Sequence, residues 1–172
     1  MRSARGDDAA SIAAIYAYHV AHGTASFDTV PRSKRETAAK IAECTDRGWP
    51  FVVAEYHGQV NGYAYATQFR DRPAYRTTCE DSIYLDPASM GQGLGTLLLA
   101  ALVEAATDAG FRQMVAVIGG AEPASVALHA RAGFVETGRM RSVGRKHGRW
   151  LDTLYMQRSL GAGDTISPEL EP

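Results

Sequence analysis

The sequence predicts one α/β domain built around a sheet that mixes parallel and antiparallel strands. Three observations lead to this prediction. Two helical segments precede a pair of alternating strands, a continuous apolar run follows a long helical stripe, and 172 residues suit one domain of ordinary size. The succession of strand, long helix and strand indicates a crossover, which places the two strands parallel. The elements in chain order therefore describe an α/β layer with a mixed sheet of about six or seven strands.

The first part of the chain predicts two helices. Residues 8–20 carry apolar side chains at helical spacing behind an acidic start. Residues 33–47 open with Ser33 and Glu36, which have the spacing of a capping box, and they end before Gly48. We therefore expect two helices at the start, the first of them amphipathic.

Strands and the long helix come next. Residues 51–56 and 60–69 are joined by a tight turn and predict an antiparallel hairpin. Residues 77–85 predict a further strand that stops at an Asp-Pro pair. Beyond a glycine-rich turn, the apolar stripe from Leu94 to Ala105 predicts a helix that Gly110 ends.

The second half of the domain supplies the remaining elements. Residues 113–118 form a continuous apolar run, which is typical of a strand covered on both faces. Residues 123–132 predict a short helix that begins with proline and is capped by Gly133. Residues 134–141 and 150–157 predict two closing strands.

The domain is expected to end near residue 160. Residues 1–160 hold all the predicted elements, so we assign them to a single domain. Residues 161–172 contain few apolar side chains, and we expect them to form a disordered tail.

The composition excludes several classes of partner. Eighteen Lys and Arg residues against 19 Asp and Glu residues give a net charge of −1, so no basic field attracts nucleic acid or a membrane surface. No stretch approaches the ~20 apolar residues of a membrane span. Two cysteines without CxxC spacing favour a cytoplasmic protein with inert thiols. His19 and His22 lack a third residue at metal-ligand spacing, so no metal is expected.

A glycine-rich turn precedes the long helix and is the first candidate binding site. Small residues there let backbone amides point inward together at the positive end of a helix, an arrangement that binds phosphate oxygens. The glycines are spaced GxGxG, so the turn is neither a GxGxxG fingerprint nor a P-loop. A helix start with glycines for close packing is the alternative. The turn consists of Gly91, Gln92, Gly93, Leu94, Gly95 and Thr96.

At this turn the chain resembles the GNAT superfamily of acyl-CoA-dependent N-acetyltransferases. The family signature is Arg/Gln-x-x-Gly-x-Gly/Ala, and here Met90 replaces the usual first residue while the later glycines fit. The resemblance implies a GNAT fold with four helices flanking the sheet, and acetyl-CoA as the co-substrate. It also implies that the turn amides hold the pyrophosphate and that Ile83, Tyr84 and Leu85 lie along the pantetheine arm.

The resemblance narrows to the phosphinothricin N-acetyltransferase group and extends from Ile12 to Gln157. It implies transfer of acetyl to the amine of a small acidic amino acid (phosphinothricin, methionine sulfoximine or methionine sulfone) by direct attack in a ternary complex. It also implies a homodimer. The matching segments are residues 24–27, 62–66, 72–76, 80–84, 114–119, 123–125 with 128–129, and 143–152.

Acetyl transfer needs a proton acceptor, because an amine must lose its proton before it attacks the thioester. Glu80 aligns with the acidic residue that the family uses as base and begins the strand expected beside the thioester. A free Glu, with a pKa near ~4.3, is a poor base, so burial must raise its pKa or a water must relay the proton. The alternative is a Glu that pairs with Arg72 or Arg76.

The departing thiolate and the pantetheine arm involve the short helix. His129 stands where many family members place a proton-donating Tyr, so it is the candidate general acid; a packed, locally hydrogen-bonded histidine is the alternative. Glu122 replaces the Asn that usually binds the pantetheine amides, and a carboxylate can only accept hydrogen bonds. Ser125 completes the expected cofactor contacts. An amide at Tyr84 or Leu85 is the candidate for stabilising the oxyanion.

The acceptor is expected to meet a loop rich in arginine. Arg70, Arg72 and Arg76 precede Glu80, and guanidinium groups suit carboxylate, phosphinate or sulfone oxygens. Phe27 and Tyr75 would line the apolar side of this pocket. A solvated basic loop is the alternative. Two other functions remain open from the sequence: acetylation of another amine, such as a polyamine, antibiotic or protein N-terminus, and a non-catalytic acyl-CoA sensor.

Overall fold

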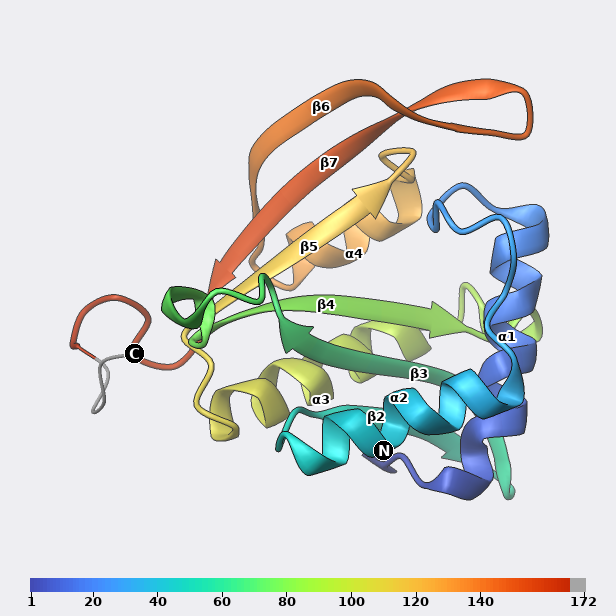
Figure 1. Cartoon of the computed structure of the whole chain (residues 1–172), viewed down its shortest axis with the longest axis horizontal. Coiled ribbons are helices and arrows are strands. Elements are labelled where there is room, and N and C mark those ends of the chain that lie inside the picture. The colour runs from blue at the N-terminus through green and yellow to red at the C-terminus, as the bar shows by residue number, and fades with distance from the viewer. Residues whose placement is uncertain (168–172) are drawn as a thin grey trace.

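Seven strands form one open sheet in the order β1-β2-β3-β4-β5-β7-β6 (Figure 1). The computed structural model describes residues 1–167 of the chain. β4 and β5 pair in parallel, and the other neighbouring strands pair antiparallel. The strands are β1 (Arg2–Ser3), β2 (Phe51–Tyr56), β3 (Gln59–Gln68), β4 (Thr78–Leu85), β5 (Gln113–Gly119), β6 (Val135–Lys146) and β7 (Arg149–Ser159).

Four α-helices cover the sheet, with α1 and α2 on one face and α3 and α4 on the other (Figure 1). The predicted mixed sheet flanked by four helices is therefore confirmed. In the described residues no helix is long and apolar enough to cross a membrane. The helices are α1 (Ala9–His22), α2 (Lys34–Asp46), α3 (Leu94–Asp108) and α4 (Pro123–Arg131), and short 3-10 turns lie at Gly6–Asp8, Pro73–Tyr75 and Pro87–Ser89.

Local sequence signals explain where several elements begin. The Ser33 hydroxyl accepts from the Glu36 amide at 3.3 Å, and the Glu36 carboxylate accepts from the Ser33 amide at 2.8 Å, so the predicted capping box is confirmed. The turn between β2 and β3 uses His57 and Gly58, both with positive φ, which suits the twist of a hairpin.

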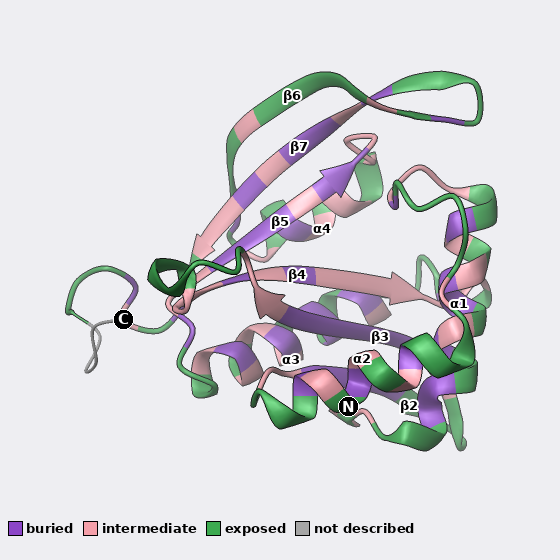
Figure 2. Cartoon of the chain, in the orientation of Figure 1, coloured by how far each residue is buried: buried purple, intermediate pink, exposed green. Residues whose placement is uncertain are grey.

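Buried side chains form two clusters, one on each face of the sheet. Leu98 and Leu102 of α3 belong to the first cluster, and Ile12 of α1 and Ile41 of α2 belong to the second. Figure 2 shows the buried residues concentrated on the central strands and on the helix sides that meet them. The sheet is therefore a wall between two cores, and side chains alternate between them along each strand.

The centre of the sheet opens between β4 and β5. Their pairing runs from Thr78 with Gln113 to Asp81 with Ala116 and stops there, although β4 continues to Leu85. Figure 1 shows the two strands diverging beyond this point. Along its last residues, the edge of β4 that faced β5 therefore has no strand partner. The candidate site lies in this gap.

The closing hairpin is longer than the sequence predicted. β6 continues to Lys146 instead of ending at Arg141, because the chain reverses only at His147 and Gly148, both with positive φ. A register shift between Met140 and Gly144 lets the strand bend and continue.

The N-terminal end of the chain differs from the sequence prediction, and part of the C-terminal end lies outside the described residues. The short strand β1 was not predicted, because two residues carry no alternation. Residues 161–167 form turns, in which the Gly163 amide donates to the Leu160 carbonyl oxygen at 2.8 Å. Residues 168–172 of the predicted tail lie outside the described residues.

Candidate active site

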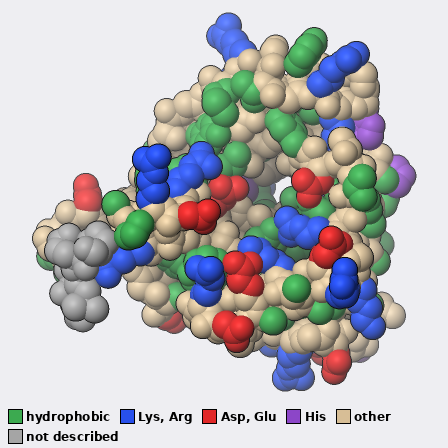
Figure 3. Space-filling view, in the orientation of Figure 1, with side chains coloured by type: hydrophobic (Ala, Val, Ile, Leu, Met, Phe, Trp, Pro, Cys, Tyr) green, Lys and Arg blue, Asp and Glu red, His purple; other side chains and the backbone are tan. Residues whose placement is uncertain are grey.

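A cavity of about 720 Å³ occupies the gap beyond the last β4–β5 pair. Its walls come from the end of α1, the last residues of β4, the glycine turn before α3 and the first turns of α4. Figure 3 shows the α1–α2 side of the molecule hollowed near this gap, with acidic and basic side chains around the hollow. Elements from both halves of the sheet therefore enclose one space.

The backbone of β4 presents free groups to this cavity. The Phe69 amide donates to the Thr78 carbonyl oxygen at 3.0 Å and the Asp86 amide donates to the Asn61 carbonyl oxygen at 2.8 Å, so hydrogen-bonded pairs with β3 recur at every second residue between them. Tyr84 belongs to such a pair, whereas Ile83 and Leu85 do not. The amides of Ile83 and Leu85 therefore face the gap.

This alternation corrects one of the two predicted oxyanion donors. The amide of Tyr84 faces β3, so that of Leu85 is the candidate that the geometry leaves. The Tyr84 side chain still lines the cavity. The carbonyl oxygen of Leu85 accepts from the His19 ring at 2.8 Å, which holds the end of the strand in place.

The glycine turn is suited to binding an anion. Gly91 and Gly93 have φ of 73° and 81°, which only glycine adopts without strain, and Gly93 caps the 15-residue helix α3. The first amides of a helix have no intrahelical acceptor, so those of Leu94 and Gly95 are available. The turn therefore fits the pyrophosphate of coenzyme A, with the strand amides next to it suited to the pantetheine arm.

Most of the predicted cofactor residues lie around the same cavity. Gln92 and Leu94 do not line it with their side chains, because Gln92 Nε2 donates to the Ala88 carbonyl oxygen at 2.8 Å and Leu94 packs on the core. Only their amides could contact a ligand. The predicted residues that line the cavity are Ile83, Tyr84, Leu85, Gly91, Gly93, Gly95, Thr96, Glu122 and Ser125.

Glu122 stabilises the start of the helix that follows it, α4. Its carboxylate accepts from the Ser125 amide at 2.8 Å and so caps the N-terminus of α4. Ala121 before it has a positive φ of 47°, which turns the chain sharply from β5 into the helix. The residue that replaces the family's Asn therefore shapes the cavity wall, whether or not it contacts the cofactor.

Glu80 is half-buried on β4, at the last positions where β5 still pairs with it. Burial raises the pKa of Glu80 and the neighbouring charge of Asp81 raises it further, while Arg70 acts in the opposite direction. Within the described residues Glu80 forms no ion pair, so the predicted alternative of pairing with Arg72 or Arg76 is not observed.

His129 lies on the other face of the sheet from Glu80. Its side chain is 2% exposed, and its two ring nitrogens contact Asp81 Oδ2 at 3.0 Å and the Ser125 carbonyl oxygen at 2.8 Å. The ring also packs edge-on against Phe134. These contacts favour the alternative of a packed histidine, and the general-acid role stays a prediction.

The predicted acceptor residues lie on two loops. Tyr75 stacks edge-on against Phe69, and the Phe27 ring packs over Gly144 of the closing hairpin. Arg72 is exposed and Arg76 is half-buried. Of the three arginines of this loop, the one whose charge acts on Glu80 is Arg70, which also lies over the Phe69 ring at 4.4 Å.

Sequence reasoning missed the contribution of α1 to the cavity. Tyr18, His19 and His22 line it, although the two histidines suggested only a surface role. The signal was present for His19, because it continues the helical stripe of buried Ile12, Ile15 and Tyr16. Its contact with Leu85 depends on how α1 crosses β4, which no local pattern encodes.

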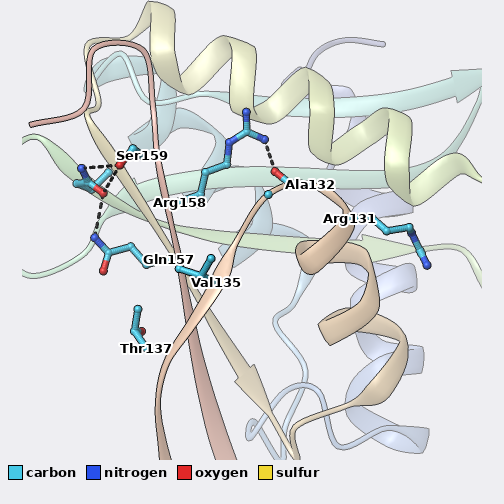
Figure 4. Close-up of a pocket in the computed structure, with 9 residues that line it drawn as sticks. Arg131, Ala132, Val135, Thr137, Gln157, Arg158 and Ser159 are labelled. Carbon is cyan, nitrogen blue, oxygen red and sulfur yellow. Dashed lines mark hydrogen bonds between the residues drawn. The ribbon is translucent and has the colours of Figure 1, made fainter. Parts of the chain in front are cut away.

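A second, open groove lies at the other end of α4 (Figure 4). Its polar side chains satisfy one another: Gln113 bonds to Gln157 and Ser159, and Arg158 donates to the Ala132 carbonyl oxygen. The groove therefore lies between the end of α4 and the closing strands, which the Arg158 hydrogen bond links. None of the predicted site residues line it.

Comparisons with known proteins agree with this geometry. A family model described as an acetyltransferase (GNAT) domain matches residues 1–155. A phosphinothricin N-acetyltransferase of Alcaligenes faecalis is 49% identical over 98% of this chain and 86% of its own length. An L-methionine sulfoximine/L-methionine sulfone acetyltransferase of Pseudomonas aeruginosa is 38% identical over 93% of this chain and 94% of its own.

The fold matches a solved structure equally well. The crystal structure of a GNAT superfamily phosphinothricin acetyltransferase from Sinorhizobium meliloti in complex with acetyl-CoA has a TM-score of 0.95 and 50% identity. The match covers 97% of this chain and 91% of that one. The chain therefore belongs to the GNAT family of acetyltransferases. Within it, the resemblance to the phosphinothricin N-acetyltransferase group is confirmed, and the chain is an acetyl-CoA-dependent N-acetyltransferase.

Proposed function

We propose that the acceptor is the amine of a small acidic amino acid such as phosphinothricin, methionine sulfoximine or methionine sulfone. The observation that carries this proposal is the half-buried, unpaired Glu80 next to a loop that contains Arg70, Arg72 and Arg76. A guanidinium can bind the anionic or sulfone oxygens of the acceptor while Glu80 takes the amine proton. The named substrates of the relatives support the same class.

The proposed reaction is a direct transfer within a ternary complex. Glu80, itself or through a water, removes the proton from the acceptor ammonium, and the free amine attacks the acetyl carbonyl carbon. The developing oxyanion accepts a hydrogen bond from the Leu85 amide in the gap. The attack forms the carbon–nitrogen bond, and collapse of the tetrahedral intermediate restores the carbonyl and breaks the carbon–sulfur bond. The nitrogen then loses a second proton, which balances the proton taken up by the departing thiolate to give the amide and the thiol of coenzyme A.

A thiol-release assay with acetyl-CoA and a panel of amines tests the substrate class. We expect turnover with phosphinothricin, methionine sulfoximine or methionine sulfone, and a much lower kcat/KM with polyamines and aminoglycosides, because the loop before Glu80 carries Arg70, Arg72 and Arg76, which repel polycations. Turnover of polyamines in preference to every acidic amino acid would refute the proposal. Arg70→Gln should raise KM for the acidic acceptor, and Arg112→Gln, outside the loop, serves as the matched control.

We also propose a homodimer in the cytoplasm. The closing hairpin exposes large apolar side chains, Trp150 at 67% and Val143 at 50%, and such surface supports association. Light scattering should give twice the chain mass, and Trp150→Glu should lower it. The free buried thiols of Cys44 and Cys79 are compatible with a reducing compartment, and cell fractionation tests that location.

A further inference from the structure

Asp81 and His129 form a buried pair that joins β4 to α4. Both side chains are 2% exposed, and His129 Nε2 lies 3.0 Å from Asp81 Oδ2. The second carboxylate oxygen, Oδ1, is buried and has no hydrogen-bond partner among the described residues. His129 is therefore the group that compensates the Asp81 carboxylate, and removal of either partner leaves an unpaired polar group in the core.

The geometry fixes how many protons the pair holds. The Ser125 carbonyl oxygen can only accept, so the His129 Nδ1, 2.8 Å away, carries a proton and donates it. The contact between Nε2 and the carboxylate then needs a second proton, located on either the ring or Asp81. Without that proton, the Nε2 lone pair faces a carboxylate oxygen and the contact becomes repulsive.

The Asp81–His129 pair lies between the β4–β5 gap and the α4 wall of the cavity, so breaking the pair would affect the cavity. Asp81 is opposite Ala116, the last β5 residue that pairs with β4 before the strands separate. On the helix side, His129 bonds to Ser125, which lines the cofactor cavity and whose amide is capped by Glu122. The chain of contacts therefore runs from the start of the gap to the α4 wall of the cavity.

We propose that Asp81 is a positioning residue: together with His129 it pins α4 to β4 and holds the α4 wall in the form that binds acetyl-CoA. Loss of the shared proton at alkaline pH releases the pin and weakens acetyl-CoA binding. This inference rests on acetyl-CoA occupying the cavity and is independent of which amine is the acceptor.

The pH range follows from the groups around the pair. Burial by itself lowers the pKa of His129, but the hydrogen bond and charge of Asp81 outweigh it, so the pKa of His129 is raised overall. The pair therefore keeps its proton below that raised pKa and loses it as pH rises through it. The neighbouring titratable groups on β4 are Glu80 and Cys79. Burial raises the pKa of the Cys79 thiol and also that of the Glu80 carboxyl group.

Among the described residues, the other elements packed around the pair bring one further charge near it, that of half-buried Arg158 on β7, which donates to the Ala132 carbonyl oxygen just after α4. The facing β5 residues Met114 and Ala116 are apolar, as are Phe134 and the buried residues of α3, and Arg131 of α4 is exposed. Guanidinium groups stay charged in the alkaline range, so the alkaline dependence of cofactor binding can be assigned to the His129 ring beside Asp81.

Calorimetric titration of acetyl-CoA into the enzyme between about pH 7 and pH 9 tests the proposal without an acceptor amine. We expect the wild-type Kd to rise about tenfold across this range. Asp81→Asn should have a nearly constant Kd, because its amide can donate to the unprotonated Nε2 of a neutral His129 and needs no titrating proton. Asp164→Asn, an exposed position, is the control for loss of one negative charge and should follow the wild type.

Asp81→Ala gives the complementary result. It should bind acetyl-CoA about tenfold more weakly already at neutral pH, and a smaller loss in Asp81→Asn would show rescue by the conservative variant. A wild-type alkaline rise that persists in Asp81→Asn overturns the proposal, and so does a wild-type Kd that does not change with pH. If Asp81→Ala fails to fold, the pH comparison of the wild type with Asp81→Asn decides the question alone.

Discussion

At the scale of single residues, neighbouring side chains on β4 do different work because they face opposite sides of the sheet. Glu80 lies on the α1–α2 side and Asp81 on the α3–α4 side, among the residues of the other core. One carboxylate is therefore left unpaired and half-buried, whereas the next is paired with His129. Two acids that are adjacent in the sequence thus lie in different surroundings on opposite faces of the sheet.

Glu80→Gln tests the base at this scale. Because burial and Asp81 raise the pKa of Glu80, wild-type kcat/KM should fall on the acid side as pH drops through that raised pKa and the carboxylate gains a proton. Gln cannot accept the proton, so kcat should fall about 100-fold and the acid limb should disappear.

The measurement is the pH dependence of thiol release at saturating acetyl-CoA. Glu104→Gln, an exposed position on α3, is the matched control and should keep the wild-type profile. A Glu80→Gln enzyme with an unchanged rate at all pH values would contradict the assignment.

At the scale of elements, the site depends on where regular structure stops. β5 stops pairing with β4 at Ala116, the glycine turn delays the start of α3 to Leu94, and Ala121 turns sharply into α4. Each interruption leaves backbone amides without an internal partner, facing one cavity. These neutral amides are suited to a highly charged ligand, which is compatible with the net charge of −1.

Gly93→Ala tests the turn. Gly93 has a φ of 81° and a methyl group there would meet no atom within 4 Å, so the cost is backbone strain of about 1 kcal/mol, not a clash. The turn should relax away from this conformation and Kd for acetyl-CoA should rise several-fold. Gly138→Ala, which also has open space but no positive φ, is the control in the same calorimetric titration and should bind like the wild type.

At the scale of the whole molecule, the loop between α1 and α2 joins the two halves of the sheet. A methyl group on Gly144 would lie 2.2 Å from the Phe27 ring, and one on Gly119 would lie 2.6 Å from the Ala25 carbonyl oxygen. Lys146 donates to the Ser26 carbonyl oxygen at 2.7 Å. Residues 24–27 therefore pack directly on β5 and on the closing hairpin, across the gap from α1.

Gly144→Ala should lower the free energy of unfolding by about 1–3 kcal/mol, because the added methyl overlaps the Phe27 ring. In Phe27→Ala the ring is absent, so adding Gly144→Ala to that variant should lower the free energy of unfolding by much less. Urea denaturation of the four proteins in this double-mutant cycle measures the difference. Additive effects of the two substitutions would contradict the packing of the loop on the hairpin.

The helices, the strands and the glycine turn of the site could be predicted from the sequence. The contacts between residues far apart in the chain could not. The capping box at Ser33, the crossover helix and the glycine turn were visible because each has a local pattern. The contacts of His19 with Leu85 and of Asp81 with His129 join positions 66 and 48 residues apart. Such contacts depend on packing angles between helix and sheet, which no spacing in the chain specifies.

The sequence also could not show which backbone amides of β4 pair with β3. The amide of Tyr84 was as good a candidate for the oxyanion as that of Leu85 until the register with β3 showed which of them faces the gap. Likewise, Arg70 is equivalent to Arg72 and Arg76 in the sequence. Only the fold of the loop brings its charge to bear on Glu80.

In the mechanism that we propose, acetyl passes directly from acetyl-CoA to an acidic amino acid bound at Glu80. Single-turnover mass spectrometry, with equal amounts of enzyme, acetyl-CoA and methionine sulfone, tests it most directly. We expect N-acetyl product and free coenzyme A in equal amounts, with no mass added to the enzyme at any time. An acetylated enzyme that forms before the product, or hydrolysis of acetyl-CoA without an acetylated amino acid, would contradict it.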